Sequence, residues 1–133
     1  MLIDVLSSTD EDGVKSLIGR LTEVNINRID IIISNAGYGQ SFQPVLTTSL
    51  AEIRSDFEVN TLSPIRLFQD SFPILSKAPE PKFVLISSVL GSIEVMDASP
   101  SLSYGMSKAA GNYAIRKIHF EHQNILSIAI HPG

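Results

Sequence analysis

The chain contains no cysteine among its 133 residues. This excludes a disulfide framework and any thiolate metal site, and it fits the reducing cytosol, so we expect a cytoplasmic protein. No apolar run approaches the roughly eighteen residues of a membrane-spanning helix. Asp4 interrupts an N-terminal apolar stretch that is too short for a signal peptide. The sequence therefore predicts no membrane association.

Basic residues are also few, with ten Lys and Arg against fourteen Asp and Glu and a net charge of -4. They form no cluster or stripe of the kind that contacts phosphates, so nucleic acid is not an expected partner. His119, His122 and His131 lack a coherent ligand spacing with carboxylates, and we expect no metal site. The hydrophobic fraction of 44% is that of a globular protein. The length predicts one domain, residues 1–133.

Apolar periodicity alternates along the chain between two patterns. One is helical spacing behind a capping signal, as at Ser49 with Glu52 three positions later. The other is a short continuous apolar run, and the β-branched run at 29–34 is typical of a strand buried on both faces. The predicted order is strand 1–5, helix 14–24, strand 29–34, helix 49–76, strand 82–87, a helix containing Tyr104, and strand 125–130. Such alternation predicts an α/β fold with right-handed crossovers and a parallel sheet with helices on both faces.

Small, polar and glycine residues follow three of the predicted strands. They read "SNAGYG" after the second strand, "SSVLGS" after the third and "HPG" after the fourth. In parallel sheets, ligands bind outside the carboxyl ends of the strands. These segments let a ligand approach the backbone closely, so the sequence predicts a binding site at this edge.

Five features in this order resemble the short-chain dehydrogenase/reductase family. They are "NAG" at 35–37, Asn60, Ser88, the pair Tyr104 and Lys108, and "PG" at 132–133. The stretch "RKIHFEHQNILSIAIHPG" further resembles fungal members of the norsolorinic acid ketoreductase type. The resemblance implies a partial Rossmann-like, doubly wound parallel sheet that lacks the first two and the last family strands. It also implies an NAD(P)-dependent oxidoreductase acting on a small ketone or secondary alcohol, with NADP as the expected cofactor and NAD as the alternative.

Tyr104 and Lys108 are four residues apart, so in a helix they project from the same face. A phenol is a poor base at neutral pH, and an adjacent ammonium favours its phenolate form. The resemblance implies that Tyr104 gives a proton to the substrate carbonyl oxygen while Ser88 hydrogen-bonds the same oxygen. Ser88 is preferred over Ser87 because adjacent strand residues face opposite ways.

Asn60 has a local argument of its own. Pro64 lies four residues later and has no N–H, so the Asn60 carbonyl loses its helical partner and is available to an ordered water. The resemblance assigns that water to a proton relay from Lys108. It also implies the cofactor contacts, which are Asp4, Asn35, Ala36, Gly37, Tyr104, Lys108, Pro132 and Gly133.

A glycine-rich turn opening a helix, the usual cradle for a pyrophosphate, has no match in the sequence. We therefore expect impaired cofactor binding, an exposed edge at strand 29–34, and a segment 1–5 that frays or pairs with it. Two interpretations stay open. The chain is a carbonyl reductase, or it is an inactive remnant that acts as an interaction module. An interaction module is expected to contact its partner through the helices beginning near Ser49 and Leu102. The same helices are the expected contact between copies in a homo-oligomer. A serine hydrolase is disfavoured because no Gly-x-Ser-x-Gly elbow is present.

Overall fold

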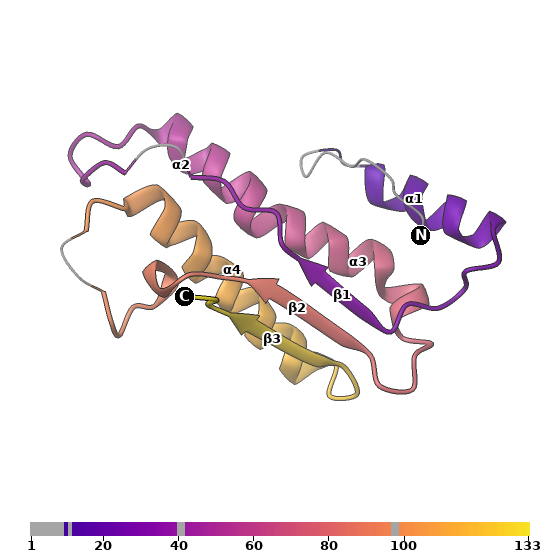
Figure 1. The fold of residues 1–133 in the computed structure, drawn as a ribbon. Coiled ribbons are helices and arrows are strands. Elements are labelled where there is room, and N and C mark those ends of the chain that lie inside the picture. The colour runs from indigo at the N-terminus through magenta and orange to yellow at the C-terminus, as the bar shows by residue number, and fades with distance from the viewer. Residues whose placement is uncertain (1–9, 11, 40–41, 97–98) are drawn as a thin grey trace.

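The computed structural model describes residues 10, 12–39, 42–96 and 99–133. The predicted strand 1–5, and with it Asp4, lies outside the described residues. The other six predicted elements are all present (Figure 1). They are α1 (Gly13–Glu23), β1 (Ile31–Ser34), α2 and α3 (Leu50–Phe57 and Ser63–Leu75), β2 (Lys82–Ile86), α4 (Leu102–Glu121) and β3 (Leu126–Ile130).

The long helix predicted from Ser49 forms as one run with a local change of winding. Its capping box is present, because the Ser49 hydroxyl accepts from the Glu52 N–H and a Glu52 carboxylate oxygen accepts from the Ser49 N–H. Between α2 and α3 the backbone winds as a π-helix over Glu58–Leu62. Pro64 follows two residues later, in the first turn of α3. The altered winding therefore lies where the missing proline N–H was expected to disturb the helix.

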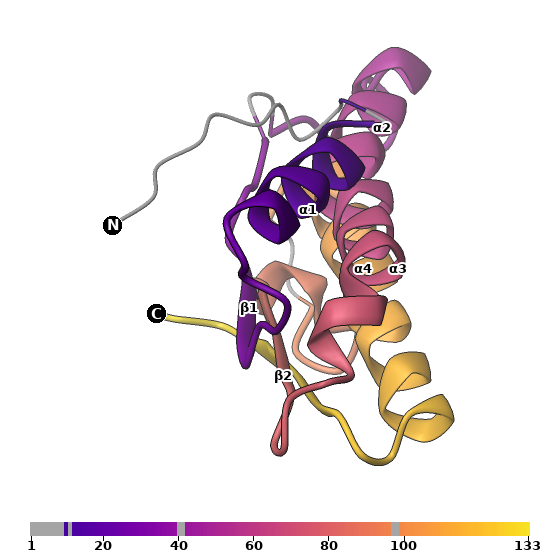
Figure 2. The ribbon, with the colours of Figure 1, turned by 90° about the vertical axis from the view of Figure 1, so that its right-hand side faces the viewer.

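The three described strands pair in parallel in the order β1-β2-β3. Each crossover thus moves in the same direction across the sheet, and right-handed crossovers of one direction place their helices on one face. Figure 2 shows α1, α2, α3 and α4 on the same side of the strands. The α/β class and the parallel sheet are confirmed. The expectation of helices on both faces is not met in the described part of the chain, because double winding needs a reversal of strand order.

The opposite face of the sheet is apolar and uncovered by any described helix. On β1, Ile32 is buried, whereas Ile31 and Ile33 are 51% and 59% exposed. The register places those two beside the outward residues of β2 and β3, including the exposed Leu126, Ile128 and Ile130. Within the described sheet β1 is also an edge strand, as predicted. The apolar run at 29–34 predicted a strand buried on both faces. In the described structure, only one face of β1 is buried.

The hydrophobic core lies between the sheet and helices α3 and α4. Phe83, in the central strand, is fully buried, and its ring centroid lies 5.2 Å from that of Phe68 in an edge-to-face contact. The remaining core residues are aliphatic, namely Ile32, Leu75, Leu85, Ile115, Ile118 and Ile125. From α4 this core uses Ile115 and Ile118, so the packing holds the second half of that helix against the sheet.

Candidate active site

A crevice of about 480 Å³ lies at the carboxyl ends of the three strands. The segments that follow β1, β2 and β3 line it together with the first turns of α4, as the strand-end argument predicted. It brings together most of the predicted site residues, namely Asn35, Gly37, Ser88, Tyr104, Lys108, Pro132 and Gly133. His131, the first residue of the "HPG" segment, also lines it. Ala36 is exposed beside the crevice and Asn60 is buried behind it.

Lys108 is the buried cation of the crevice. The residue is 2% exposed, and its Nζ donates a hydrogen bond to the Ile86 carbonyl at the end of β2, at 2.9 Å. Gly37 lies beside it, since a Cβ at that position would be in van der Waals contact with Nζ at 3.4 Å. The Nζ stands 5.6 Å from the centroid of the Tyr104 ring. The four-residue spacing on α4 therefore places Lys108 beside Tyr104, and the hydrogen bond to the Ile86 carbonyl holds the ammonium in position.

Burial lowers the pKa of Lys108 below the ordinary lysine value of 10.5. Between that lowered pKa and 10.5 the unfolded chain binds more protons than the folded one, so the free energy of unfolding rises with pH across this window. We expect Lys108→Met to lose this alkaline rise. Urea unfolding of both proteins at intervals from neutral pH to pH about 10 measures it.

Lys117 provides the control for that measurement. Its side chain is 53% exposed and paired with Glu121 at 2.8 Å, and that partner raises the pKa of Lys117 instead of lowering it. Lys117→Met should therefore keep the alkaline rise. A parent chain whose unfolding free energy follows the same pH profile as that of Lys108→Met would contradict the assignment.

The Tyr104 ring is packed against the loop that follows β1. A Cβ at Gly39 would lie 2.6 Å from Tyr104 Cδ2, so only glycine lets the backbone pass this close to the ring. Phe42, from the same loop, contacts the ring at 6.1 Å between centroids. No local signal could have found the role of Gly39, since the contact spans more than sixty residues.

Ser88 and Ser87 both line the crevice, but their hydroxyls differ in what they bind. Ser87 is buried and its Oγ donates to Asn112 Oδ1 at 2.6 Å. Ser88 Oγ accepts from the Leu90 N–H at 3.2 Å and so caps the short 3₁₀ turn Val89–Gly91. Accepting a bond leaves the Ser88 proton available as a donor. This available proton is a reason to prefer Ser88 over Ser87 as the donor to the substrate oxygen, in addition to the alternation of side chains along a strand.

Asn112 makes two hydrogen bonds to the segment after β2, and no motif in the sequence singles it out. Besides holding Ser87, its Nδ2 donates to the Gly91 carbonyl at 3.2 Å. Gly91 lies directly on α4, where an added Cβ would meet the Lys108 carbonyl carbon at 2.8 Å. The segment that contains Ser88 is therefore fixed at both ends to the helix that carries Tyr104.

Asn60 is fully buried and supports the crevice from behind. Its amide pairs with both backbone groups of Tyr38, accepting from the N–H at 2.8 Å and donating to the carbonyl at 2.6 Å. It also donates to Ser107 Oγ at 2.9 Å. Gly111 brings α4 close, since a Cβ there would lie 3.1 Å from the Asn60 carbonyl oxygen. The side chain thus joins the β1 loop to α4, and the proton relay stays a prediction.

Two further properties concern the described residues alone. No three His, Asp or Glu side chains among them gather closely enough to hold a metal ion. In the same part of the chain, no helix combines the length and the apolarity needed to cross a membrane.

Fold and crevice together define an α/β protein whose parallel strands end at a Tyr–Lys pair on the following helix. The sequence model described as short chain dehydrogenase matches residues 3–133. The chain therefore belongs to the short-chain dehydrogenase family, as the motifs predicted.

Its relatives include norsolorinic acid ketoreductases of fungi. The chain is 34% identical to nor1 of Dothistroma septosporum over 114 residues, which are 82% of this chain and 42% of that protein. It is 32% identical to the enzyme of Aspergillus parasiticus over 138 aligned residues, all of this chain and 51% of the relative. The chain thus spans about half the length of the curated relatives it matches.

Among solved structures, the chain resembles the NADPH-bound carbonyl reductase from chicken fatty liver. The two superpose with a TM-score of 0.91 at 27% identity, covering 99% of this chain and 57% of the reductase. The fold of the described residues is therefore that of a carbonyl reductase over the matched part.

Proposed function

We propose that this chain carries the proton-transfer residues of an NAD(P)-dependent carbonyl reductase. The observation that carries the proposal is the crevice in which Lys108, fixed by the Ile86 carbonyl, stands against the Tyr104 ring. Family membership and the ketoreductase and carbonyl reductase names of its relatives support it. A small ketone, or the matching secondary alcohol, is the proposed substrate.

Each crevice residue has a distinct task in the reductive direction. The Tyr104 hydroxyl gives its proton to the substrate carbonyl oxygen as negative charge develops there. The Ser88 hydroxyl, whose proton is available, donates a hydrogen bond to the same oxygen. The Lys108 ammonium, whose Nζ lies 5.6 Å from the centroid of the Tyr104 ring, places a positive charge beside the residue that gives up the proton.

We assign the crevice to the nicotinamide end of the cofactor. Gly37 presents bare backbone beside Lys108, where an added Cβ would be in van der Waals contact with Nζ at 3.4 Å. Asn35, Pro132 and Gly133 provide further exposed backbone and polar groups along the opening. We assign these residues, together with Ala36 and Asp4, to cofactor contact. When bound, the reduced cofactor supplies the hydride.

We expect the isolated chain to bind NADPH weakly or not at all. The sequence offers no glycine-rich turn at a helix N-terminus to hold the pyrophosphate, which is normally a large share of the contact. A titration of the purified chain, followed by NADPH fluorescence, should show no saturation at micromolar cofactor. Saturable micromolar binding would contradict this expectation and the interpretation of the chain as an inactive remnant.

A chimera tests the proposed function. In it, the aligned segment of the A. parasiticus ketoreductase is replaced by this chain, and NADPH consumption is followed with norsolorinic acid as the ketone. We expect measurable reduction. A folded chimera that binds NADPH but consumes none would overturn the proposal.

The second candidate is an interaction module, and a stripe on α4 favours it. Met106, Tyr113 and Phe120 are spaced by seven residues and are 47%, 71% and 58% exposed. Leu50 of the neighbouring α2 is exposed as well. We propose self-association through these helices, compatible with either function. The cytoplasmic location stays a prediction.

A further inference from the structure

The aromatic and the polar groups of the active-site crevice come from different segments of the chain. Ser88 follows β2 and His131 follows β3, and they bring a hydroxyl and an imidazole to the lining. The segment after β1 contributes Asn35 and, further along, two aromatic residues, Tyr38 and Phe42. A ligand in the crevice therefore meets polar side chains from two segments and aromatic residues from the third.

The ring of Phe42 lies beside that of Tyr104. Their centroids are 6.1 Å apart and their planes are inclined by 57°, within the range of about 4.5 to 7 Å that aromatic pairs favour. Despite this contact, Phe42 is 52% exposed. An apolar aromatic surface thus stays open to water next to the residue to which the proton transfer is assigned.

The segment that leads to Phe42 is held against α4. Asn60 pairs with both backbone groups of Tyr38, through hydrogen bonds of 2.8 and 2.6 Å. Gly39 then passes so close to the Tyr104 ring that a Cβ there would lie 2.6 Å from Cδ2. Contacts that are present before a ligand arrives lower the ordering cost of binding.

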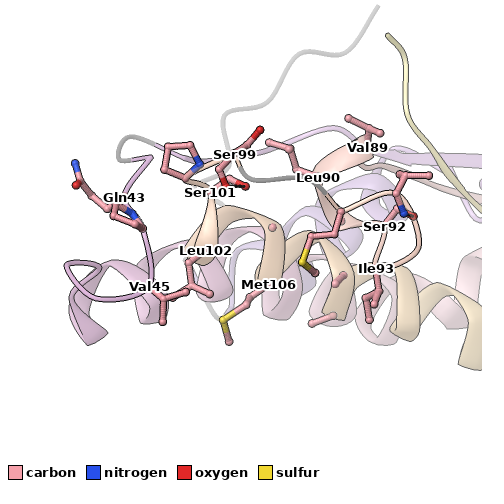
Figure 3. A pocket seen from close by; sticks show the side chains of 18 of the residues that line it. Gln43, Val45, Val89, Leu90, Ser92, Ile93, Ser99, Ser101, Leu102 and Met106 are labelled. Carbon is pink, nitrogen blue, oxygen red and sulfur yellow. Dashed lines mark hydrogen bonds between the residues drawn. The ribbon is translucent and has the colours of Figure 1, made fainter.

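The residue after Phe42 belongs to a different cavity. Figure 3 shows Gln43 at the end of a second cavity, of about 620 Å³, that shares no lining residue with the crevice. Among the described residues that line this second cavity, Phe57 is the one aromatic residue. Phe42 therefore contributes its exposed ring to the active-site crevice, and its neighbour Gln43 does not.

The proposed proton transfer sets where the substrate lies. With the carbonyl oxygen at the Tyr104 and Ser88 hydroxyls, a substituent on the carbonyl carbon comes within reach of the Phe42 ring. A flat aromatic substituent would cover this exposed ring, and aromatic pairs gain free energy beyond that of the buried area. We propose that Phe42 is a specificity-determining residue that packs against an aromatic ring attached to the substrate carbonyl. This inference rests on the proposed reductase function.

The ketoreductase chimera tests the role of Phe42 with three methyl ketones, namely acetophenone, cyclohexyl methyl ketone and butanone. Phe42→Ala should lower kcat/KM for acetophenone about tenfold and that for butanone by no more than about twofold, since an ethyl group covers little of the ring. Phe42→Leu should lower kcat/KM for acetophenone but not for cyclohexyl methyl ketone, because it keeps an apolar surface without a ring. Phe42→Tyr should retain the parent values. If circular dichroism shows that Phe42→Ala is unfolded, Phe42→Leu replaces it.

Gln43→Ala is the matched control, at the adjacent residue that faces the other cavity. It should leave kcat/KM unchanged for all three ketones. The inference is overturned if Phe42→Ala affects acetophenone and butanone equally, or if Gln43→Ala has the same selective effect. It is also overturned if the chimera reduces norsolorinic acid but not acetophenone. A chimera that binds NADPH and reduces no ketone overturns the proposed function itself, and the role of Phe42 falls with it.

Discussion

Replacing Tyr104 by Phe in the ketoreductase chimera should reduce kcat by about a hundred- to ten-thousand-fold, the usual contribution of a positioned proton donor. The substitution removes only the hydroxyl and leaves the ring in its contacts with Gly39 and Phe42. The KM for the ketone should change much less, because the lost interaction develops in the transition state. Initial rates over a range of ketone concentrations measure both constants.

Tyr113→Phe is the matched control for this experiment. It makes the same chemical change on the same helix, at a side chain that is 71% exposed and outside the crevice. Its rate should equal that of the unmodified chimera. A Tyr104→Phe chimera that retains full activity would remove Tyr104 from the mechanism and leave Ser88 or a water as the proton source.

Phe83→Ala should lower the free energy of unfolding by about 3 to 5 kcal/mol, the range for emptying a buried aromatic site. Phe83 is 0% exposed in the central strand, and its ring packs edge-to-face on Phe68. Its neighbours on both sides are hydrogen-bonded strands, which cannot collapse into the space. Urea unfolding followed by circular dichroism measures the change, and a loss this large approaches the whole stability of many domains.

Phe120→Ala is the comparison, because Phe120 is 58% exposed on α4 and does not belong to the hydrophobic core. Its ring lies 4.8 Å from the Arg116 guanidinium, so we expect a loss of about 0.5 to 1 kcal/mol. If both substitutions lowered the free energy of unfolding equally, this would contradict the central role in the core that the packing assigns to Phe83.

Local sequence signals predicted the elements that form from neighbouring residues. The capping box at Ser49, the β-branched strands and the Tyr104–Lys108 spacing all depend on residues a few positions apart. The altered winding near Asn60 followed from the chemistry of a single proline. These features were predictable because each is set by short-range geometry.

The supports of the crevice were not predictable in the same way. Two of these supports are hydrogen bonds between residues more than twenty positions apart. One joins the Asn60 amide to the Tyr38 backbone, and the other joins Asn112 to the Gly91 carbonyl. Neither pair has a spacing rule, since the loops between them can be of any length. The finding that no described helix covers one sheet face was likewise hidden, because a β-branched run has the same composition whether one face or both are covered.

The uncovered face of the sheet also has a thermal consequence. Ile31, Ile33, Leu126 and Ile128 already contact water in the folded chain, so unfolding adds little to their hydration. The heat capacity of unfolding arises mainly from newly hydrated apolar surface, and it sets the curvature of stability with temperature. The described unit should therefore have a flatter stability curve than a domain of equal length covered on both faces, with weaker destabilisation on cooling.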